Sequence, residues 1–355
     1  YKLTTTSTRR KKRFGRHRTR QVDAEDRQSV LEALGDMPIR RDLLIEYLHK
    51  LQDQYKHISA GHIVALADLM KLAPAEIYEV ATFYHHFDVV ADGQPIPPLL
   101  TVRVCDSVTC ELFGSEVLVS SLQASLGDDI RVQRVPCVGR CDEAPVAVVG
   151  KNAIPRATVS KVSDMVREGS ALITTQPDWI RIDEYRRDGG YKAYEACRAG
   201  SLTHEHILDE LESSGLRGLG GAGFPAGRKW RILKDQSAPR LMAINIDEGE
   251  PGTFKDRYYL ERDPHRFIEG MLIAAEVIGI ECCYLYVRDE YPGVLQILGD
   301  AIKELDSVFD NELPEVHIRR GAGAYICGEE SAMIESIEGK RGMPRLRPPY
   351  VAEVG

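Results

Sequence analysis

The chain has 355 residues, of which 43% are hydrophobic and 28% are charged, so it is long enough for two or three globular domains. It contains no run of 18 apolar residues and no apolar segment at its start, and the sequence therefore predicts neither a membrane span nor a secretory signal. The formal net charge is −8, although residues 1–22 carry nine Lys or Arg residues and no acidic residue. An acidic body argues against general nucleic-acid binding, and we expect a cytoplasmic protein.

The basic residues 1–22 include few apolar groups, which is typical of a disordered arm. We expect this arm to dock on an acidic partner, in preference to a nuclear or nucleic-acid role. Residues 23–92 have helical periodicity and predict a small helical bundle. One apolar stripe is formed by Leu43, Leu44, Tyr47, Leu48 and Leu51. Ser59 and Pro74 stand where helices should begin.

Residues 97–168 alternate between strand-like and helix-like patterns. Strands are expected at 100–105, 130–132 and 146–149, with helices at 112–126 and 161–167. Four cysteines follow strands in this region: Cys105, Cys110, Cys137 and Cys141. A compact α/β domain that carries two cysteine pairs is the resulting prediction.

Eight cysteines in a chain without a secretory signal favour metal or redox ligands over disulfides. The four in 97–168 have the spacing Cys-x4-Cys and Cys-x3-Cys, and small apolar residues such as Val138, Gly139 and Ala144 surround them. A [2Fe–2S] cluster is favoured, while a zinc ion and plain thiols remain alternatives. Cys197, Cys282, Cys283 and Cys327 are not expected to bind a second cluster.

A glycine-rich stretch at 216–230 is the centre of the remaining sequence. Its glycines include Gly218, Gly220, Gly221 and Gly223, and it ends in Arg228-Lys229-Trp230. Such a backbone can approach a ligand closely and direct N–H groups at a phosphate, while Phe224 offers a surface for stacking. The stretch matches the Gly-x-Gly-x-x-Gly dinucleotide pattern, but a helical pattern at 204–214 precedes it instead of a strand. We therefore reject an ordinary Rossmann turn.

Residues 169–203 have weak periodicity and are interpreted as a connecting linker, which leaves 204–355 as the last domain. After the glycine stretch, strands expected at 241–245, 283–287 and 316–319 alternate with helices, which predicts a mostly parallel sheet. Polar and glycine-rich phrases follow the first and last of these strands, at 245–252 and 321–331, where open α/β sheets bind ligands. A fourth phrase at 340–350 has cations and Tyr350, which suit a dinucleotide.

These phrases resemble two subunits of respiratory complex I. Residues 26–168 resemble the thioredoxin-like [2Fe–2S] subunit, and residues 215–355 resemble the FMN- and NADH-binding subunit. The implied fold is an N-terminal helical bundle plus a thioredoxin-like [2Fe–2S] domain, followed by an α/β FMN-binding domain. The resemblance implies FMN contacts at Gly218, Gly220, Lys229, Asn245, Asp247, Glu248, Tyr325, Gly328, Glu329 and Glu330. It implies NAD(H) contacts at Gly221, Phe224, Glu250, Arg347 and Tyr350, with Gly223 in the same cofactor loop.

The sequence departs from this family at several positions. Leu219 and Ile232 replace residues that are Arg or aromatic in many relatives, and Tyr350 often appears as Phe, so adenine stacking is expected to be weaker. The Asn-rich flavin segment and the four-cysteine [4Fe–4S] motif of the family do not occur in the chain. We therefore expect the chain to be a fragment, with the [4Fe–4S] cluster in an absent C-terminal part.

A fusion of these two portions resembles the β-subunit of soluble NAD-dependent formate dehydrogenases. The phrases at 41–45, 82–87 and 223–230 resemble that subunit, whose partner is an α-subunit with a molybdenum or tungsten pterin cofactor. The diaphorase subunit of NAD-reducing hydrogenases is the alternative, and the four intact cysteines favour formate dehydrogenase. The resemblance implies hydride transfer between NAD(H) and FMN without an obligate acid or base, with Glu248 and Glu250 tuning position and charge. An electron-relay protein that has lost a cofactor and a zinc-dependent binding module are further hypotheses.

Overall fold

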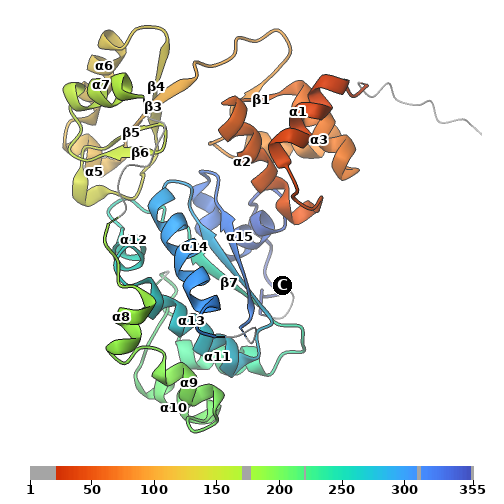
Figure 1. The fold of residues 1–355 in the computed structure, drawn as a ribbon, viewed down its shortest axis with the longest axis vertical. Coiled ribbons are helices and arrows are strands. Elements are labelled where there is room, and N and C mark those ends of the chain that lie inside the picture. The colour runs from red at the N-terminus through yellow and green to blue at the C-terminus, as the bar shows by residue number, and fades with distance from the viewer. Residues whose placement is uncertain (1–20, 170–176, 220, 310–312, 353–355) are drawn as a thin grey trace, which may run out of the picture.

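The computed structural model describes residues 21–169, 177–219, 221–309 and 313–352. Most of the basic arm predicted at 1–22 lies outside these ranges. Figure 1 shows three units, with a helical bundle and a small α/β domain above a larger C-terminal α/β domain. Within the described ranges, every helix is too short or too polar to cross a lipid bilayer.

The bundle confirms the helical interpretation of its sequence. Ser59 caps α3, because its Oγ accepts a hydrogen bond of 3.0 Å from the backbone N–H of His62, and Pro74 is the first residue of α4. The short strands β1 (Ile58–Ser59) and β2 (Val89–Val90) pair in parallel and close the bundle. Its helices are α1 (Ala24–Leu34), η1 (Arg41–Leu43), α2 (Leu44–Tyr55), α3 (Ala60–Met70) and α4 (Pro74–Phe83).

The small α/β domain has a four-stranded sheet in the order β4-β3-β5-β6. Strand β3 runs parallel to β4 and antiparallel to β5, which in turn pairs with β6. The helix expected at 112–126 begins later, at Ser115, because Gly114 with φ +87° separates it from a preceding short helix, α5. The strands are β3 (Leu100–Cys105), β4 (Ile130–Val135), β5 (Ala147–Val149) and β6 (Asn152–Ile154), and the helices are α5 (Val108–Leu112), α6 (Ser115–Ser125), η2 (Cys141–Glu143) and α7 (Val159–Glu168).

The interpretation of 169–203 as a linker misses structure that lies in it. Residues 177–203 contain α8 (Ile182–Arg187) and α9 (Lys192–Arg198), which pack on the C-terminal domain. Trp179, Tyr185, Tyr191 and Tyr194 are buried in its core. Helices of six and seven residues are too short to show a clear period, so the sequence pattern does not reveal them.

The C-terminal domain confirms the predicted parallel sheet, whose order is β7-β8-β9. Asp263 caps α13 and Gly279, with φ +74°, ends it, as the sequence predicts. Its strands are β7 (Leu241–Ile246), β8 (Cys282–Val287) and β9 (Glu315–Arg320), and its helices are α10 (His204–Ser213), α11 (Ala226–Lys234), α12 (Lys255–Leu260), α13 (Pro264–Ile278), α14 (Pro292–Asp306), η3 (Tyr325–Gly328) and α15 (Glu330–Ile337).

The bundle and the C-terminal domain share one hydrophobic core. Tyr286, Cys327 and Met333 of the C-terminal domain join the buried side chains of α1 to α4 in it. The Tyr84 hydroxyl donates a hydrogen bond of 2.7 Å to the Lys340 carbonyl and lies 2.9 Å from the Ser336 hydroxyl, which can donate to it. A Cβ added to Gly339 would lie 1.9 Å from the Arg41 carbonyl oxygen. The two parts therefore pack as a single body.

His86 adds a buried charge to this contact. Its Nδ1 lies 3.1 Å from an Asp289 carboxylate oxygen and its Nε2 lies 3.6 Å from Glu290. Burial alone would lower the pKa of His86, but the attraction of Glu290 and the hydrogen bond to Asp289 outweigh it and raise the pKa from 6.5 to about 9. The imidazolium therefore joins the segment after α4 to the segment between β8 and α14.

Replacing His86 by Gln should destabilise the protein in a pH-dependent way. The pKa of His86 is raised from 6.5 to about 9 in the folded state. The ion pair therefore contributes its full stabilisation of the folded state below pH 6.5, and this stabilisation is lost as the pH rises through about 9. The difference in free energy of unfolding between wild type and His86→Gln should therefore be largest near pH 6 and decline towards about pH 10, in chemical denaturation at a series of pH values.

His85→Gln is the matched control. Partial burial lowers the pKa of His85, so its replacement should not cost more stability at low pH than at high pH. A His86→Gln penalty that stays constant across the pH range would contradict the charged pair.

Candidate functional site

The four cysteines of the small α/β domain meet beside its sheet. Cys105 ends β3, Cys110 lies in α5, Cys137 follows β4, and Cys141 begins η2. The Cys137 and Cys141 sulfurs are 3.4 Å apart. A hydrogen bond between the thiols of Cys105 and Cys110 raises the pKa of Cys105 to about 11 and lowers that of Cys110. Cys105 also hydrogen-bonds to Cys137, so the four thiols form one continuous row in the order Cys110, Cys105, Cys137 and Cys141.

This row of thiols fits a binuclear cluster better than one zinc ion. Among the described residues, the only group of three or more His, Cys, Asp or Glu ligand atoms within 4.8 Å of one another lies elsewhere, at Cys282, Glu315 and His317. Since no three of the four thiols meet that limit, they are not gathered around one tetrahedral centre. A [2Fe–2S] cluster instead takes two thiolates on each iron.

Two backbone amides donate hydrogen bonds to these sulfurs. The N–H of Gly139 reaches Cys137 Sγ at 3.4 Å, and the N–H of Gly252 reaches Cys141 Sγ at 3.1 Å. Donors of this kind stabilise the negative charge of cluster thiolates. Gly252 belongs to the polar phrase at 245–252, so the C-terminal domain supplies one of the donors.

The loop that holds Cys137 and Cys141 docks tightly on the C-terminal domain. Buried Arg288 donates a hydrogen bond of 2.6 Å to the Cys137 carbonyl, and Arg257 donates one of 3.1 Å to the Gly139 carbonyl. Gly139 has φ +70°, and an added Cβ would lie 2.1 Å from the Tyr291 hydroxyl oxygen. Glycine is therefore required here both by the backbone and by the close approach of Tyr291.

The glycine-rich stretch forms a tight loop before α11. The backbone N–H of Gly218 donates a hydrogen bond of 3.0 Å to the Phe224 carbonyl. Arg217 and Pro225 form an isolated antiparallel β-bridge. Gly221 and Gly223 have φ +86° and +60°, and a Cβ added to either would meet no atom within 4 Å. The space above these glycines is open, as a cofactor cradle requires. Gly220, also predicted to bind the cofactor, lies outside the described residues.

Three further residues of this stretch have different surroundings. Lys229 is exposed on the second turn of α11, where its ammonium group can meet a phosphate, and Phe224 is 43% exposed. Gly227, in contrast, faces α10, because an added Cβ would lie 2.6 Å from Glu212 Cγ. Gly227 thus serves helix packing and not the loop.

Asn245 lies near the end of β7 and Asp247 directly follows it, and Asn245 contacts the segment around η3. Asn245 donates a hydrogen bond of 2.7 Å to the Gly328 carbonyl and accepts one of 3.0 Å from the backbone N–H of Asp247. The Asp247 Oδ2 atom is buried without a hydrogen-bond partner. Burial, with repulsion from Glu290, raises the pKa of Asp247 to about 7. A buried unpaired oxygen of this kind points to a ligand donor that completes it.

Glu248 does not face this cradle. Its side chain is buried and accepts hydrogen bonds from the backbone N–H of Asp256, at 2.9 Å, of Arg257, at 3.3 Å, and from the Tyr291 hydroxyl, at 3.0 Å. The carboxylate therefore holds the start of α12. Both oxygens of Glu248 accept hydrogen bonds within the chain, which gives it a positioning role, and its place beside the reacting rings stays a prediction.

Glu250 and Tyr325 lie together at the rim of the cradle. The Tyr325 hydroxyl donates a hydrogen bond of 3.3 Å to Glu250, and Tyr325 is 63% exposed. A Cβ added to Gly249 would lie 2.8 Å from the Tyr325 ring. The aromatic side chain thus lies directly over the glycine backbone, and both polar groups are accessible to a ligand.

Glu329, Glu330 and Arg347 form an ion-pair group at the N-terminus of α15. Glu329 caps the helix by accepting from the N–H groups of Ser331 and Ala332, each at 2.9 Å. Arg347 pairs with Glu329 and, at 2.8 Å, with Glu330. The structure therefore brings these predicted residues together. Tyr350 is exposed at the adjoining segment.

Family models match both parts of the chain. Residues 30–170 match the model described as thioredoxin-like [2Fe-2S] ferredoxin, and residues 211–355 match the one described as Nuo51 FMN-binding domain. The chain thus contains a thioredoxin-like [2Fe–2S] domain followed by an FMN-binding domain. The predicted fold class and the FMN and [2Fe–2S] cofactors are thereby confirmed.

Individual relatives come from two kinds of enzyme. An NADH-quinone oxidoreductase subunit of Aquifex aeolicus (strain VF5) is 47% identical over 214 residues, which are 57% of this chain and 48% of that protein. NAD-reducing hydrogenase HoxS subunit alpha of Cupriavidus necator is 32% identical over 360 residues, covering 89% of this chain and 58% of that protein. The chain thus spans about half the length of the curated relatives it matches.

Solved structures agree with these relatives. A crystal structure of an NAD⁺-reducing [NiFe]-hydrogenase in the H₂-reduced state has a TM-score of 0.73 and 31% identity. The match covers 88% of this chain and 57% of that one. The arrangement of the two domains therefore has a counterpart in an NAD⁺-reducing hydrogenase.

The residues present fit FMN and the cluster. Open space above Gly221 and Gly223, the unpaired Asp247 oxygen and the exposed Lys229 supply room, a polar acceptor and a cation for the flavin. The row of thiols with two amide donors suits the [2Fe–2S] cluster. Sequence reasoning missed Arg288, Arg257 and Tyr291, which carry no motif and act only through contacts distant in sequence.

Replacing Gly139 by Ala should disturb the cluster without abolishing the fold. The added Cβ would meet the Tyr291 hydroxyl at 2.1 Å, so the loop that carries Cys137 and Cys141 must shift. We expect a smaller iron content per chain and faster cluster loss on exposure to a chelator, measured by iron analysis and visible absorption.

Gly127→Ala is the control for backbone strain in the same domain. Gly127 has φ +73°, but an added Cβ there would meet nothing within 4 Å. Equal cluster loss in the two variants would show that docking against Tyr291 has no role in holding the cluster.

Proposed function

We propose that the chain is the diaphorase module of a larger NAD-dependent oxidoreductase. Hydride would pass between NAD(H) and FMN, and single electrons would pass between FMN and iron–sulfur clusters. The observation that carries this proposal is the 3.1 Å hydrogen bond from the Gly252 N–H to Cys141 Sγ. It joins the end of the flavin loop at 245–252 directly to a cluster ligand.

The chain's own residues would bind and orient the cofactors. Bound FMN supplies the exchange between two-electron and one-electron chemistry. Gly218, Gly221 and Gly223 would lie beneath it, with Lys229 at its phosphate. Asn245 and Asp247 would hold its polar atoms, together with the segment from Tyr325 to Glu330. Gly220, which lies outside the described residues, would belong to the same loop.

NAD(H) would lie on the exposed side of this cradle. Phe224 and Tyr350 would provide surfaces for its rings, and Glu250 would accept hydrogen bonds from it. Arg347 already pairs with Glu329 and Glu330, so it would have to exchange a carboxylate for a dinucleotide phosphate. Glu250 is therefore the carboxylate we assign to tuning charge near the nicotinamide, while Glu248 positions α12.

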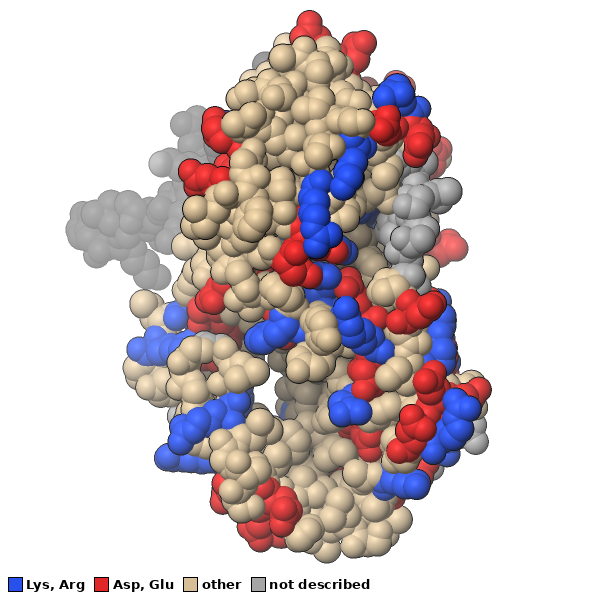
Figure 2. Space-filling model, turned by 90° about the vertical axis from the view of Figure 1, so that its left-hand side faces the viewer, with Lys and Arg blue, Asp and Glu red and all other residues tan. Residues whose placement is uncertain are grey.

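An apolar surface beside the cluster supports the presence of a further subunit. Val108, Leu112, Phe113 and Val117 are between 57% and 81% exposed on α5 and α6, around the ligand Cys110. In Figure 2 the upper part of the molecule carries few charged side chains, while acidic and basic groups gather below it. Exposed apolar side chains next to a redox centre suit a protein partner.

We infer that this partner is the molybdenum- or tungsten-pterin subunit of a formate dehydrogenase. The phrases at 41–45, 82–87 and 223–230 and the four intact cysteines support that choice. A hydrogenase is the second candidate, because HoxS subunit alpha aligns with 89% of the chain. In either assembly electrons from the partner would collect on FMN and leave as NADH, and the same route could run in reverse.

Replacing Lys229 by Ala should weaken FMN binding through its phosphate. Loss of a hydrogen bond to a charged group costs about 1.5–3 kcal/mol, which corresponds to a dissociation constant about 10- to 100-fold larger. Equilibrium dialysis with FMN and with riboflavin measures this effect, and the affinity for riboflavin, which lacks the phosphate, should not change.

Lys234→Ala on the same helix is the matched control, since Lys234 pairs with Glu205 at 2.8 Å. It should retain FMN as the wild type does. Full FMN affinity in Lys229→Ala would refute the phosphate contact, and a purified protein without flavin or cluster absorption would refute the diaphorase assignment itself.

The metal content of the purified complex distinguishes a formate dehydrogenase partner from a hydrogenase partner. Affinity purification of the protein from its native cells, followed by elemental analysis of the complex, should yield molybdenum or tungsten together with iron. Formate-dependent NAD⁺ reduction by the same complex should accompany it. Nickel in place of either metal, with hydrogen-dependent NAD⁺ reduction, would reject the formate assignment and leave the diaphorase module standing.

A further inference from the structure

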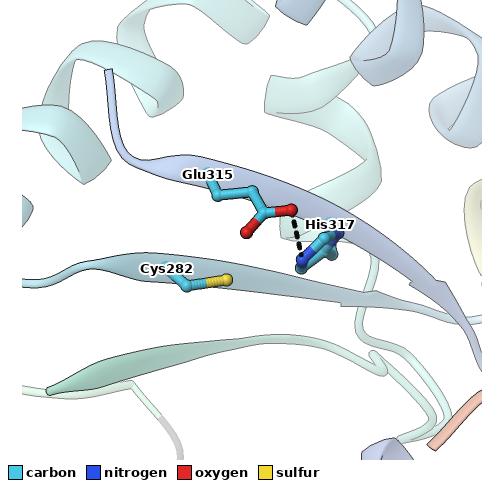
Figure 3. Close-up of side chains that lie close together, drawn as sticks. All are labelled: Cys282, Glu315 and His317. Carbon is cyan, nitrogen blue, oxygen red and sulfur yellow. Dashed lines mark ion pairs between the residues drawn. The ribbon is translucent and has the colours of Figure 1, made fainter. Parts of the chain in front are cut away.

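Three potential metal ligands meet at the amino ends of β8 and β9. The loops assigned to the cofactors follow the carboxyl ends of the strands, at the opposite end of the sheet. Cys282 begins β8, and Glu315 and His317 lie at the start of β9. One ligand atom of each residue lies within 4.8 Å of the other two. In Figure 3 the Cys282 sulfur, the Glu315 carboxylate and the His317 ring converge from the two neighbouring strands, and His317 Nε2 is 3.2 Å from Glu315.

Parallel strand pairing fixes this arrangement. Cys282 is the direct partner of Glu315, and Tyr284 is the partner of His317. Since side chains alternate along a strand, Cys282, Glu315 and His317 all project from the same face of the sheet. A site built on paired strands holds its ligands more firmly than one built on a loop.

We propose that Cys282, Glu315 and His317 form a zinc site with one coordination position left for water. Thiolate, imidazole and carboxylate are the three side-chain ligand types that Zn²⁺ accepts in proteins. A set of three protein ligands with a solvent-accessible side is typical of open zinc sites, whereas closed structural sites have four. The Glu315 side chain is 71% exposed, which leaves the site open to solvent.

The chemistry of each ligand suits a cation that displaces a proton. Zn²⁺ would bind the Cys282 thiolate as the thiol proton leaves to water, and the neutral imidazole of His317 through Nε2. The Tyr284 hydroxyl hydrogen-bonds to Cys282 and stabilises its thiolate.

Two cations lie near the group, and both are compensated. Arg40 pairs with Asp42 at 2.8 Å. Arg319 pairs with the same carboxylate at 2.9 Å and lies 3.8 Å from Glu46. Asp42 and, in part, Glu46, whose pKa burial raises to about 7, offset the two guanidinium charges, while Glu315 and the Cys282 thiolate would supply two negative charges to the metal itself.

Zinc X-ray absorption of the full chain, with flavin and cluster in place, tests the site directly. After zinc addition and gel filtration, wild-type protein should retain about one Zn²⁺ per chain with a single sulfur at ~2.3 Å and N/O ligands at ~2.0–2.2 Å. Four sulfur ligands would mean that zinc has entered the cluster site, and no sulfur would mean surface binding. Either result overturns the proposal.

Ligand variants make the assignment specific. Cys282→Ser should remove the sulfur shell, and His317→Gln should weaken zinc binding by at least the roughly 10- to 100-fold that loss of an outer-shell partner causes. His206→Gln and Glu210→Gln, at exposed positions of α10, should bind zinc as wild type does. Unchanged zinc affinity in both ligand variants would overturn the site, and unchanged iron content would show that each variant keeps its fold.

Discussion

A buried guanidinium holds together the parts that meet at the two cofactor sites. Arg288, 4% exposed, donates to the backbone carbonyls of Cys137 and Glu248 and pairs with Glu290 at 2.9 Å. Burial alone would lower the pKa of Arg288, but attraction to Glu290 raises it, so the charge is retained. Removing this cation would leave two carbonyls and a carboxylate buried without their partner, which is costly. Arg288 therefore connects the loop of Cys137, the loop of Glu248 and, through Glu290, the contact with His86 of the bundle.

Local patterns predicted much of this architecture. The alternation of strands and helices identified the parallel sheet, and caps such as Ser59 and Asp263 placed helix starts correctly. Cysteine spacing selected the four thiols that lie in one row in the structure. Glycines before α11 identified a loop that leaves open space above Gly221 and Gly223. These features are readable because each depends on residues close together in the chain.

Other features depend on residues far apart in sequence. A carboxylate in a polar loop looks like a ligand group, and only the folded chain shows that Glu248 is engaged by α12 and Tyr291. His86 belongs to the phrase at 82–87, yet only the folded chain shows that it joins the bundle to Asp289 across about 200 positions of sequence. The aromatic residues of α8 and α9 gave too short a pattern to indicate a helix. Docking contacts were therefore the part that the sequence could not predict.

The N–H of Gly252 donates to Cys141 Sγ, and Gly252 ends the loop at 245–252 that we assign to the flavin. With cluster and dinucleotide bound, the two ends of this loop would be linked by thermodynamic reciprocity. Reduction of the cluster would strengthen the sulfur as an acceptor and so change the affinity of the loop for dinucleotide. A dinucleotide that tightened or loosened the loop would, by the same amount of free energy, shift the cluster's midpoint potential.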